Sequence, residues 1–139
     1  MATSFAIVET ILDTYVATLA VPTIQKENTI LKSTGKTEFT RTQVAPAITV
    51  QETIGLTGQD RLNGIYVIDL FYPRDAGTAT ALATVDILAL AFEAGTVLTD
   101  GTDNVEVWNS YPTPSLPNLE NFYQRQVIVE WRSYRNRLV

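Results

Sequence analysis

Apolar side chains recur at every third or fourth position over the first twenty residues of the chain. The apolar positions are Phe5, Val8, Ile11, Leu12, Tyr15, Val16 and Leu19. This spacing places them along one stripe of an amphipathic helix. A hydroxyl residue at the start and Pro22 just beyond the end predict a helix from Thr3 or Ser4 to Leu19 or Ala20. We expect its stripe to pack against the core.

The segment from Thr23 to Thr57 is rich in Thr, Val, Ile and Gln and has few helix formers. This composition predicts extended structure. The expected extended segments are Thr23 to Leu31, Glu38 to Gln43 and Ala47 to Ile54. Residues Ser33 to Lys36 supply a turn, so the first two segments are predicted to form a hairpin. Residues Gly55 to Gly64 are predicted to form a glycine-bearing loop.

The run from Ile65 to Tyr72 is apolar on both of its alternating faces. One face carries Tyr66, Ile68, Leu70 and Tyr72, and the other carries Ile65, Val67, Asp69 and Phe71. Such a strand is typical of the centre of a sheet. We therefore expect its second face to be covered, either by another protein chain or by a loop of the same chain.

A second helix is predicted from Thr78 to Ala94, because this segment is rich in Ala and Leu and is followed by Gly95. Its predicted core stripe is Leu82, Val85, Leu88, Ala89 and Phe92. Ile87, Leu90 and Ala91 broaden that stripe, which predicts a deeply covered helix.

Three further segments complete the chain. Val97 to Leu98 and Val105 to Trp108 flank the sequence TDGTDN, which predicts a hairpin. The three prolines in Ser110 to Asn118 predict a stiff extended loop. Phe122 to Trp131 or beyond is predicted to be the last strand, with Val127, Val129 and Trp131 on one face.

The predicted strands mostly follow one another instead of alternating with helices. This order predicts an α+β fold, with one mainly antiparallel sheet and two helices packed on one face. The length of 139 residues fits a single domain spanning residues 1–139.

Composition narrows the possible chemistry. The chain has no Cys and no His, which removes disulfides, thiolate chemistry and imidazole-based catalysis or metal binding. A net charge of −5 predicts a surface that on average repels nucleic acid. The basic residues Arg125, Arg132, Arg135 and Arg137 are interpreted as a solvated strand edge and tail. No segment has the length of a membrane span or the pattern of a signal peptide, so we expect no membrane partner.

The sequence LKSTGKTEFTR at Leu31 to Arg41 contains GKT, the end of a Walker A phosphate loop, and Asp69 closes a run that resembles Walker B. A Walker A loop needs a glycine where this chain has Ile30, and it needs a helix directly after it. The residues after Thr37 read as a strand instead. A nucleotide site is therefore disfavoured.

The turn with Asp100, Gly101, Asp103 and Asn104 holds oxygen ligands that suit Ca²⁺. It lacks the bidentate glutamate and the register of an EF-hand loop, so a plain turn is the favoured interpretation. We expect no catalytic residues, no cofactor and no metal, and hence no enzyme.

Several segments together resemble the phage tail terminator, or tail completion, family of long-tailed, siphovirus-type phages. They are the opening helix, Glu27 and Asn28, Phe39 to Arg41, RLNGIYVIDLFYPRDAGTATAL and FYQRQVIVEWRSYR. The most specific part is Gly64 to Tyr72 followed by Pro73, Gly77 and an alanine-rich helix. The resemblance spans most of the chain.

The resemblance implies a virion structural protein that forms a homo-oligomeric ring, typically a hexamer, on the last ring of the tail tube. Its partners would be itself, the tail tube protein and the head–tail connector protein, with DNA only as cargo passing through the lumen. It would lie at the head-proximal end of the tail and assemble in the host cytoplasm. Two alternatives remain: another neck or tail completion subunit, and a small nucleotide- or ligand-binding protein.

Within this interpretation, the hairpin around GKT is a candidate arm that contacts a neighbouring subunit, although it is equally compatible with an ordinary exposed hairpin. Thr34, Lys36, Glu38 and Arg41 offer polar contacts, and Phe39 offers an anchor. The second face of the central strand adds Ile65, Val67 and Phe71 as candidate contact residues.

Overall fold

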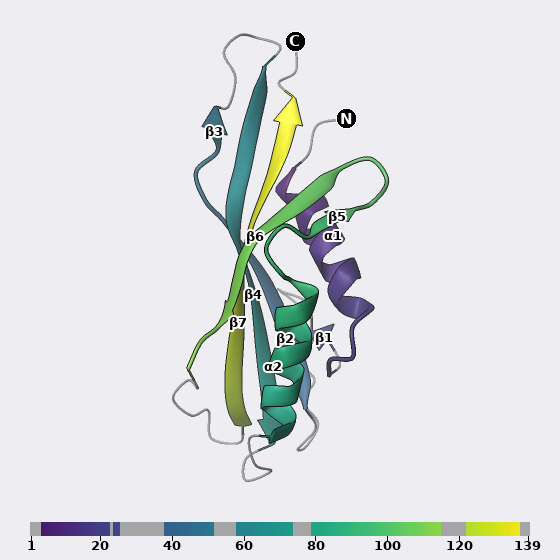
Figure 1. Cartoon of the computed structure of the whole chain (residues 1–139), viewed down its shortest axis with the longest axis vertical. Helices are drawn as coiled ribbons and strands as arrows, with labels where there is room; N and C mark the ends of the chain where they lie inside the picture. The colour runs from purple at the N-terminus through teal and green to yellow at the C-terminus, as the bar shows by residue number, and fades with distance from the viewer. Residues whose placement is uncertain are drawn as a thin grey trace.

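The computed structural model describes residues 4–22, 24–25, 38–51, 58–73, 79–114 and 122–136. These residues form two helices and one sheet of seven strands (Figure 1). The helices are α1 (Phe5–Ala17) and α2 (Ala79–Ala91). The strands are β1 (Ile24–Gln25), β2 (Phe39–Pro46), β3 (Val50–Gln51), β4 (Gln59–Pro73), β5 (Val97–Thr99), β6 (Asn104–Pro112) and β7 (Phe122–Asn136).

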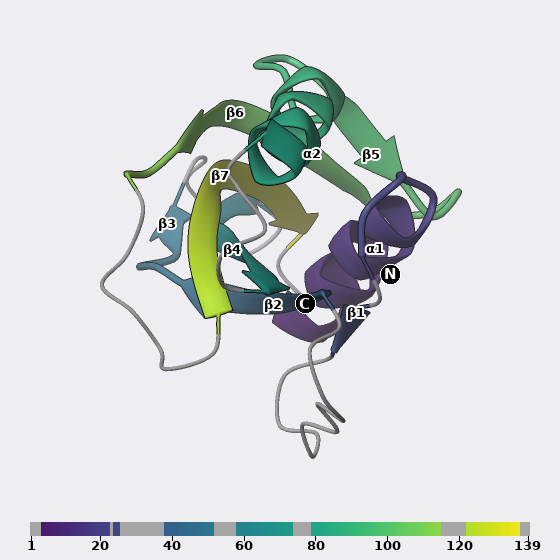
Figure 2. The same ribbon diagram turned by 90° about the horizontal axis from the view of Figure 1, so that it is seen from below.

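The sheet has the strand order β1-β2-β4-β7-β6-β5, and β3 pairs with β4 beyond the end of β2. All strand pairs are antiparallel except β1 with β2. Seen from below, the sheet curves around both helices, which lie on its inner side (Figure 2). The predicted α+β class, with one mainly antiparallel sheet and two helices on one face, is confirmed. We call the helix-covered side the inner face and the opposite side the outer face.

The predicted hairpin between the first two extended segments is wrong. β1 pairs with β2 in parallel, with Ile24 opposite Thr40. Two parallel strands cannot be joined by a tight hairpin turn, because the chain must travel back to the starting end of the sheet. The predicted turn at Ser33 to Lys36 lies outside the described residues.

The predicted loop from Gly55 to Gly64 is also wrong in its second half, because β4 begins at Gln59. β4 and β7 pair over 15 residues each, from Gln59 with Asn136 to Pro73 with Phe122. Gly64 belongs to the strand because a Cβ atom there would lie 2.6 Å from the carbonyl oxygen of Ala45 and 2.8 Å from Trp131 Cζ2. Glycine here allows close packing across the strand and does not mark a turn.

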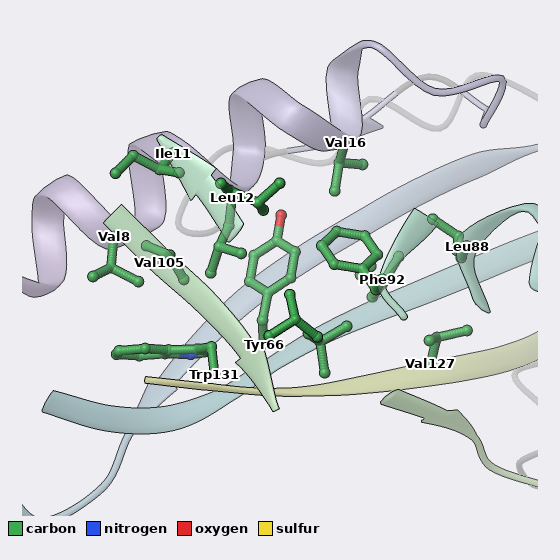
Figure 3. Close-up of a cluster of buried hydrophobic side chains, with 14 of the residues drawn as sticks. Val8, Ile11, Leu12, Val16, Tyr66, Leu88, Phe92, Val105, Val127 and Trp131 are labelled. Carbon is green, nitrogen blue, oxygen red and sulfur yellow. The ribbon is translucent and has the colours of Figure 1, made fainter. Parts of the chain in front are cut away.

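The core lies between the inner face and the helices (Figure 3). Val8, Leu12 and Val16 of α1 are fully buried, which confirms the predicted stripe. α1 starts at the predicted position, since the Ser4 hydroxyl caps it by accepting the amide hydrogen of Ile7 at 3.3 Å. It ends at Ala17, two or three residues earlier than predicted.

The core face of the two central strands matches the prediction. Tyr66, Ile68, Leu70 and Tyr72 of β4 and Val127, Val129 and Trp131 of β7 are all buried. Trp131 meets Phe5 of α1 edge to face, with the ring centroids 6.0 Å apart. The last strand continues beyond Trp131 to Asn136, as the open-ended prediction allowed.

Helix α2 is shorter and less covered than predicted. It runs from Ala79 to Ala91 and buries Ala81, Thr84, Val85 and Leu88. Leu82, a predicted core residue, is 41% exposed, and Leu90 is 70% exposed. The segment is apolar nearly all round, so its sequence does not specify which side of the helix faces the sheet. In the structure, the smaller residues Ala81 and Thr84 are on the buried side.

The predicted hairpin is confirmed as β5 and β6, with Leu98 opposite Val105 and Gly101 at the turn with a φ of 98°. β6 extends to Pro112, so the first residues of the predicted proline-rich loop are strand. A β-bulge between Val107 and Asn109 inserts Trp108 as an extra residue without a partner in the ladder with β7. Residues 115–121 lie outside the described part of the chain.

Candidate interaction surfaces

The predicted arm is only partly within the described residues. Thr34 and Lys36 lie outside them, and Glu38 is exposed directly before β2. The residues from Phe39 onward form a strand, not the helix that a phosphate loop requires. The structure therefore agrees with the interpretation that GKT is not part of a nucleotide site.

Phe39 and Phe71 lie together on the outer face of the sheet. They are paired across β2 and β4, and their rings stack with centroids 4.5 Å apart. Both side chains are buried, at 7% and 1% exposure. The guanidinium of Arg41 lies 5.1 Å from the centroid of the Phe71 ring. The structure thus brings three predicted contact residues into one cluster, in which the phenylalanines already contact each other.

Asp69, the apparent Walker B residue, is held in the same part of the outer face. Its Oδ1 accepts hydrogen bonds from the side-chain amides of Gln124 at 3.2 Å and Gln126 at 2.9 Å. Arg41 lies 4.0 Å from its Oδ2. Since these partners are all side chains of neighbouring strands, Asp69 links strands β2, β4 and β7 and its contacts do not resemble a nucleotide site.

Ile65 and Val67 lie further along the outer face and are half-buried. The strand register places Val67 beside Ile128 of β7, and Ile128 beside Tyr111 of β6. Neither helix covers these neighbouring outer-face residues, because α1 and α2 both pack on the inner face (Figure 2). The second face of the central strand therefore has apolar residues that are only partly covered, while Asp69 and Phe71 at its other end are buried within the chain.

Among the residues that the structure describes, the exposed aromatic side chains of the outer face are Trp108, Tyr111 and Tyr134, at 55%, 40% and 40%. The guanidinium of Arg132 stacks 4.8 Å from the centroid of the Trp108 ring. Arg132 also forms a 2.8 Å ion pair with Glu106. This contact fixes the exposed indole in place, and exposed Trp, Tyr and Arg are the residue types that dominate protein interfaces.

The second exposed apolar surface is the side of α2 that points away from the sheet. Leu82, Ile87 and Leu90 are its large exposed residues. Ala79 and Ala83 lie between them and are also exposed. A helix that is apolar on its solvent side as well as its core side is typical of a segment that becomes covered by another surface.

The predicted turn with Asp100 forms a plain turn. Asp100 Oδ1 accepts the backbone amide hydrogens of Thr102 and Asp103, at 2.9 and 2.8 Å. These bonds hold the pKa of Asp100 below its ordinary value, and the bond from Asp103 has the larger effect. Within the described residues, His, Cys, Asp and Glu side chains do not gather in a group of three that could hold a metal ion.

The C-terminal arginines that the structure describes act within the sheet. Arg132 pairs with Glu106, and Arg135 lies 3.6 Å from Asp60 on the neighbouring strand. Arg137 lies outside the described residues. The interpretation as a solvated strand edge is wrong for Arg132, because β7 lies between β4 and β6 and Arg132 is paired with Asn63 on one side and Glu106 on the other.

A hollow of about 370 Å³ lies beside α1, with Glu9, Asp13 and Ile24 in its lining. Asp13 Oδ1 accepts hydrogen bonds from the hydroxyls of Thr42, at 3.0 Å, and Tyr66. Burial and the Asp13 carboxylate raise the pKa of Tyr66 far above its ordinary value. The carboxylate facing this hollow thus attaches α1 to the sheet.

No helix in the part of the chain that the structure describes has the length and apolar character needed to cross a membrane.

Two of the exposed surfaces were missed from the sequence. Trp108 was assigned to a hairpin strand without a role. The alternation of Val105 and Val107 with Glu106 and Trp108 is enough to turn Trp108 away from the core, but it does not show that this face stays uncovered. Leu82 was assigned to the core. A signal was present for α2, since its apolar residues exceed what one core stripe can bury.

Comparisons with known proteins agree with this architecture. A sequence model of a family described as phage tail terminator protein matches residues 5–131. A chain of known structure superposes with a TM-score of 0.68 at 17% sequence identity, covering 99% of this chain and 98% of that chain. At this identity the superposition shows a shared fold. A search of curated protein sequences found no significant match.

Proposed function

Because the chain belongs to the phage tail terminator family, we propose that it forms a ring that caps the tail tube, ends tail polymerisation and provides the surface for head–tail joining. Family membership establishes a structural component of a phage tail. The match over residues 5–131 carries the proposal, because it includes both helices and the sheet up to Trp131.

The proposed ring is a homo-oligomer, with six subunits expected, that stacks on the last ring of the tail tube protein. A closed ring needs two different contact surfaces on each subunit, because each subunit meets its two neighbours through opposite sides. The exposed outer face around Trp108 and the exposed side of α2 support this requirement. The head–tail connector protein would bind the free side of the ring, at the head-proximal end of the tail.

The charge of the chain is compatible with DNA as cargo. Its net charge is −5, so the surface on average repels the phosphates of passing DNA. A ring around a DNA channel functions only if the DNA slides through without binding. The protein would be assembled into the virion in the host cytoplasm.

The experiment that tests the proposal combines purified protein with purified tail tubes and images the product by negative-stain electron microscopy. The expected result is a discrete ring on one end of each tube and an arrest of tube growth when the protein is added during polymerisation. Deletion of the gene is expected to give overlong tails that do not join heads.

Other outcomes identify the alternatives. Binding to head-side connector rings without binding to tubes would assign the chain to the neck. A monomer that binds a nucleotide or another small ligand, and ignores tubes, would contradict a structural role at the tail end. A monomer in solution alone does not decide the question, because many ring subunits assemble only on a template.

A further inference from the structure

The two exposed apolar surfaces lie on opposite sides of the molecule. α2 packs on the inner face through Ala81, Val85 and Leu88, so Leu90 and its exposed neighbours point away from the sheet. Trp108 and Tyr111 belong to the outer face. Two different surfaces that face opposite ways suit head-to-tail association, in which one surface of a subunit meets the other surface of the next.

The two surfaces also differ in chemistry in a complementary way. The segment from Ala79 to Ala94 contains Asp86 and Glu93 and no Lys or Arg. The outer face carries charges of both signs, with Glu106 paired to Arg132. Its Arg41 has a side chain that is 47% exposed and is at the 4.0 Å limit of an ion pair with Asp69. A helix with only acidic charges therefore matches a sheet face with an accessible arginine better than it matches a second copy of itself.

The dimensions of the surfaces agree as well. α2 has 13 residues and is about 20 Å long at ~1.5 Å per residue. Strands β2, β4, β7 and β6 lie side by side, so the outer face spans about 15 Å between the first and the last at ~4.8 Å per strand. By the strand register, Arg41 is level with Gln126 of β7 and Trp108 lies beside Glu130 and Trp131, so a helix would cross the strands diagonally to reach from one to the other. The small side chains of Ala79 and Ala83 would permit close contact.

We infer that the exposed side of α2, centred on Leu90, packs against the outer sheet face of an adjacent copy of this chain, beside Trp108. This inference rests on the proposed ring, for which it names the contact between neighbouring subunits. The half-buried residues Val67 and Ile128 become covered in that contact. The tail tube and the connector are then left to bind elsewhere on the ring.

Cross-linking tests the contact directly, because the chain has no cysteine of its own. Leu90→Cys and Trp108→Cys proteins are mixed on tail tubes and treated with a short bis-maleimide, and the linked peptides are identified by mass spectrometry. We expect cross-links between positions 90 and 108 to exceed links between identical positions by about tenfold. Ala6→Cys is the matched control, since Ala6 is apolar, exposed on α1 and part of neither surface. Equal yields for all pairs, or efficient linkage at position 6, would overturn the inference.

A second measurement uses charge. Leu90→Glu and Trp108→Glu proteins should each remain folded by circular dichroism and fail to form rings. A mixture of the two should form dimers in native mass spectrometry, because it retains one intact α2 surface and one intact sheet surface. Ala6→Glu, on the exposed side of α1, should assemble like the wild type. Normal rings from either single variant contradict the inference.

These experiments separate the two levels of the proposal. Wild-type rings on tail tubes without a link between positions 90 and 108 would reject this contact and leave the proposed function standing. The absence of any wild-type assembly, in solution or on tubes, would reject the proposed function and the contact together.

Discussion

The hydroxyl of Tyr66 in β4 donates a hydrogen bond to Asp13 in α1, across 53 positions of the sequence. Tyr66 is fully buried, and Thr42 of β2 donates to the same carboxylate oxygen at 3.0 Å. One carboxylate at the edge of the core thus holds the helix against two strands. Because a buried hydroxyl without a partner is unfavourable, this bond also defines where α1 sits along the sheet.

Replacing Tyr66 by Phe should lower the free energy of unfolding by about 1–2 kcal/mol, since it removes one hydrogen bond to a carboxylate and leaves the ring in place. The pH dependence should change too. The pKa of Tyr66 is raised above its ordinary value of 10.0, so its contribution is fully present below pH 10 and is lost as the pH rises beyond it.

Urea unfolding between pH 8 and 11.5 checks this prediction. The wild type should lose stability above pH 10, and Tyr66→Phe should lose less. Tyr72, whose pKa is also raised by burial, contributes a decline in the same direction that remains in the variant. Identical slopes for the two proteins would contradict the assigned role.

Gly64→Ala should destabilise the protein by about 1–3 kcal/mol, because the added methyl group overpacks the sheet. Its Cβ would lie 2.6 Å from the backbone oxygen of Ala45, which cannot move without disturbing β2. Gly95→Ala is the contrasting control: its φ of 91° disfavours a side chain, but no atom lies within 4 Å of the place its Cβ would take. A melting temperature for Gly64→Ala equal to that of the wild type would contradict the prediction, because it would mean that the sheet accommodates the methyl group.

Asp69 is expected to act through its hydrogen bonds. Asp69→Ala should cost about 1–3 kcal/mol, since it leaves the amides of Gln124 and Gln126 without their acceptor. Asp69→Asn should cost less, because both amides donate to one oxygen that asparagine retains. Mg²⁺ and ATP should not shift the melting temperature of the wild type. A shift that disappears in Asp69→Asn would instead support a nucleotide site.

The stabilising contribution of Asp100 should be lost in acid. Its pKa lies below the ordinary value of 3.8, so its stabilising effect is present above about pH 4 and is lost as the pH falls through the lower value of the folded state. Asp100→Asn can still accept the turn hydrogen bonds but does not titrate. Thermal melts from pH 5 to pH 2 should therefore show a smaller decline for this variant than for the wild type.

Periodicity was sufficient to predict the elements whose two sides differ. The stripe of α1 and the alternation in β7 each specify one orientation, and the structure has them as predicted. α2 is apolar on nearly every side, so periodicity did not specify which side faces the sheet, and Leu82 was assigned wrongly. Gly64 is a strand residue and not the predicted loop residue, because glycine is required there by the approach of the Ala45 carbonyl and of Trp131, both distant in sequence.

The interaction surfaces were harder to predict than the fold. Phe39 and Phe71 looked like candidate anchors, and the register of β2 with β4 stacks them on each other within the chain. Trp108 faces outward by strand alternation, and its exposure depends on what covers the outer face of the sheet, while the bulge after Val107 also turns Asn109 outward through the pairing with β7. Exposure of a residue in a strand depends on its partners across the sheet, and those partners cannot be read from local sequence.

The margins of the sheet have a consequence for solubility. In the part of the chain that the structure describes, the outermost strands β1 and β5 have two and three residues. The strands next to them end at Pro46 and Pro112, and β6 carries the bulge at Trp108. Short margins, prolines and bulges all discourage strand-by-strand growth into fibrils. A protein proposed to stop the growth of a polymer is therefore itself protected from amyloid-like growth at its sheet edges. Its self-association is left to the outer sheet face and the exposed side of α2.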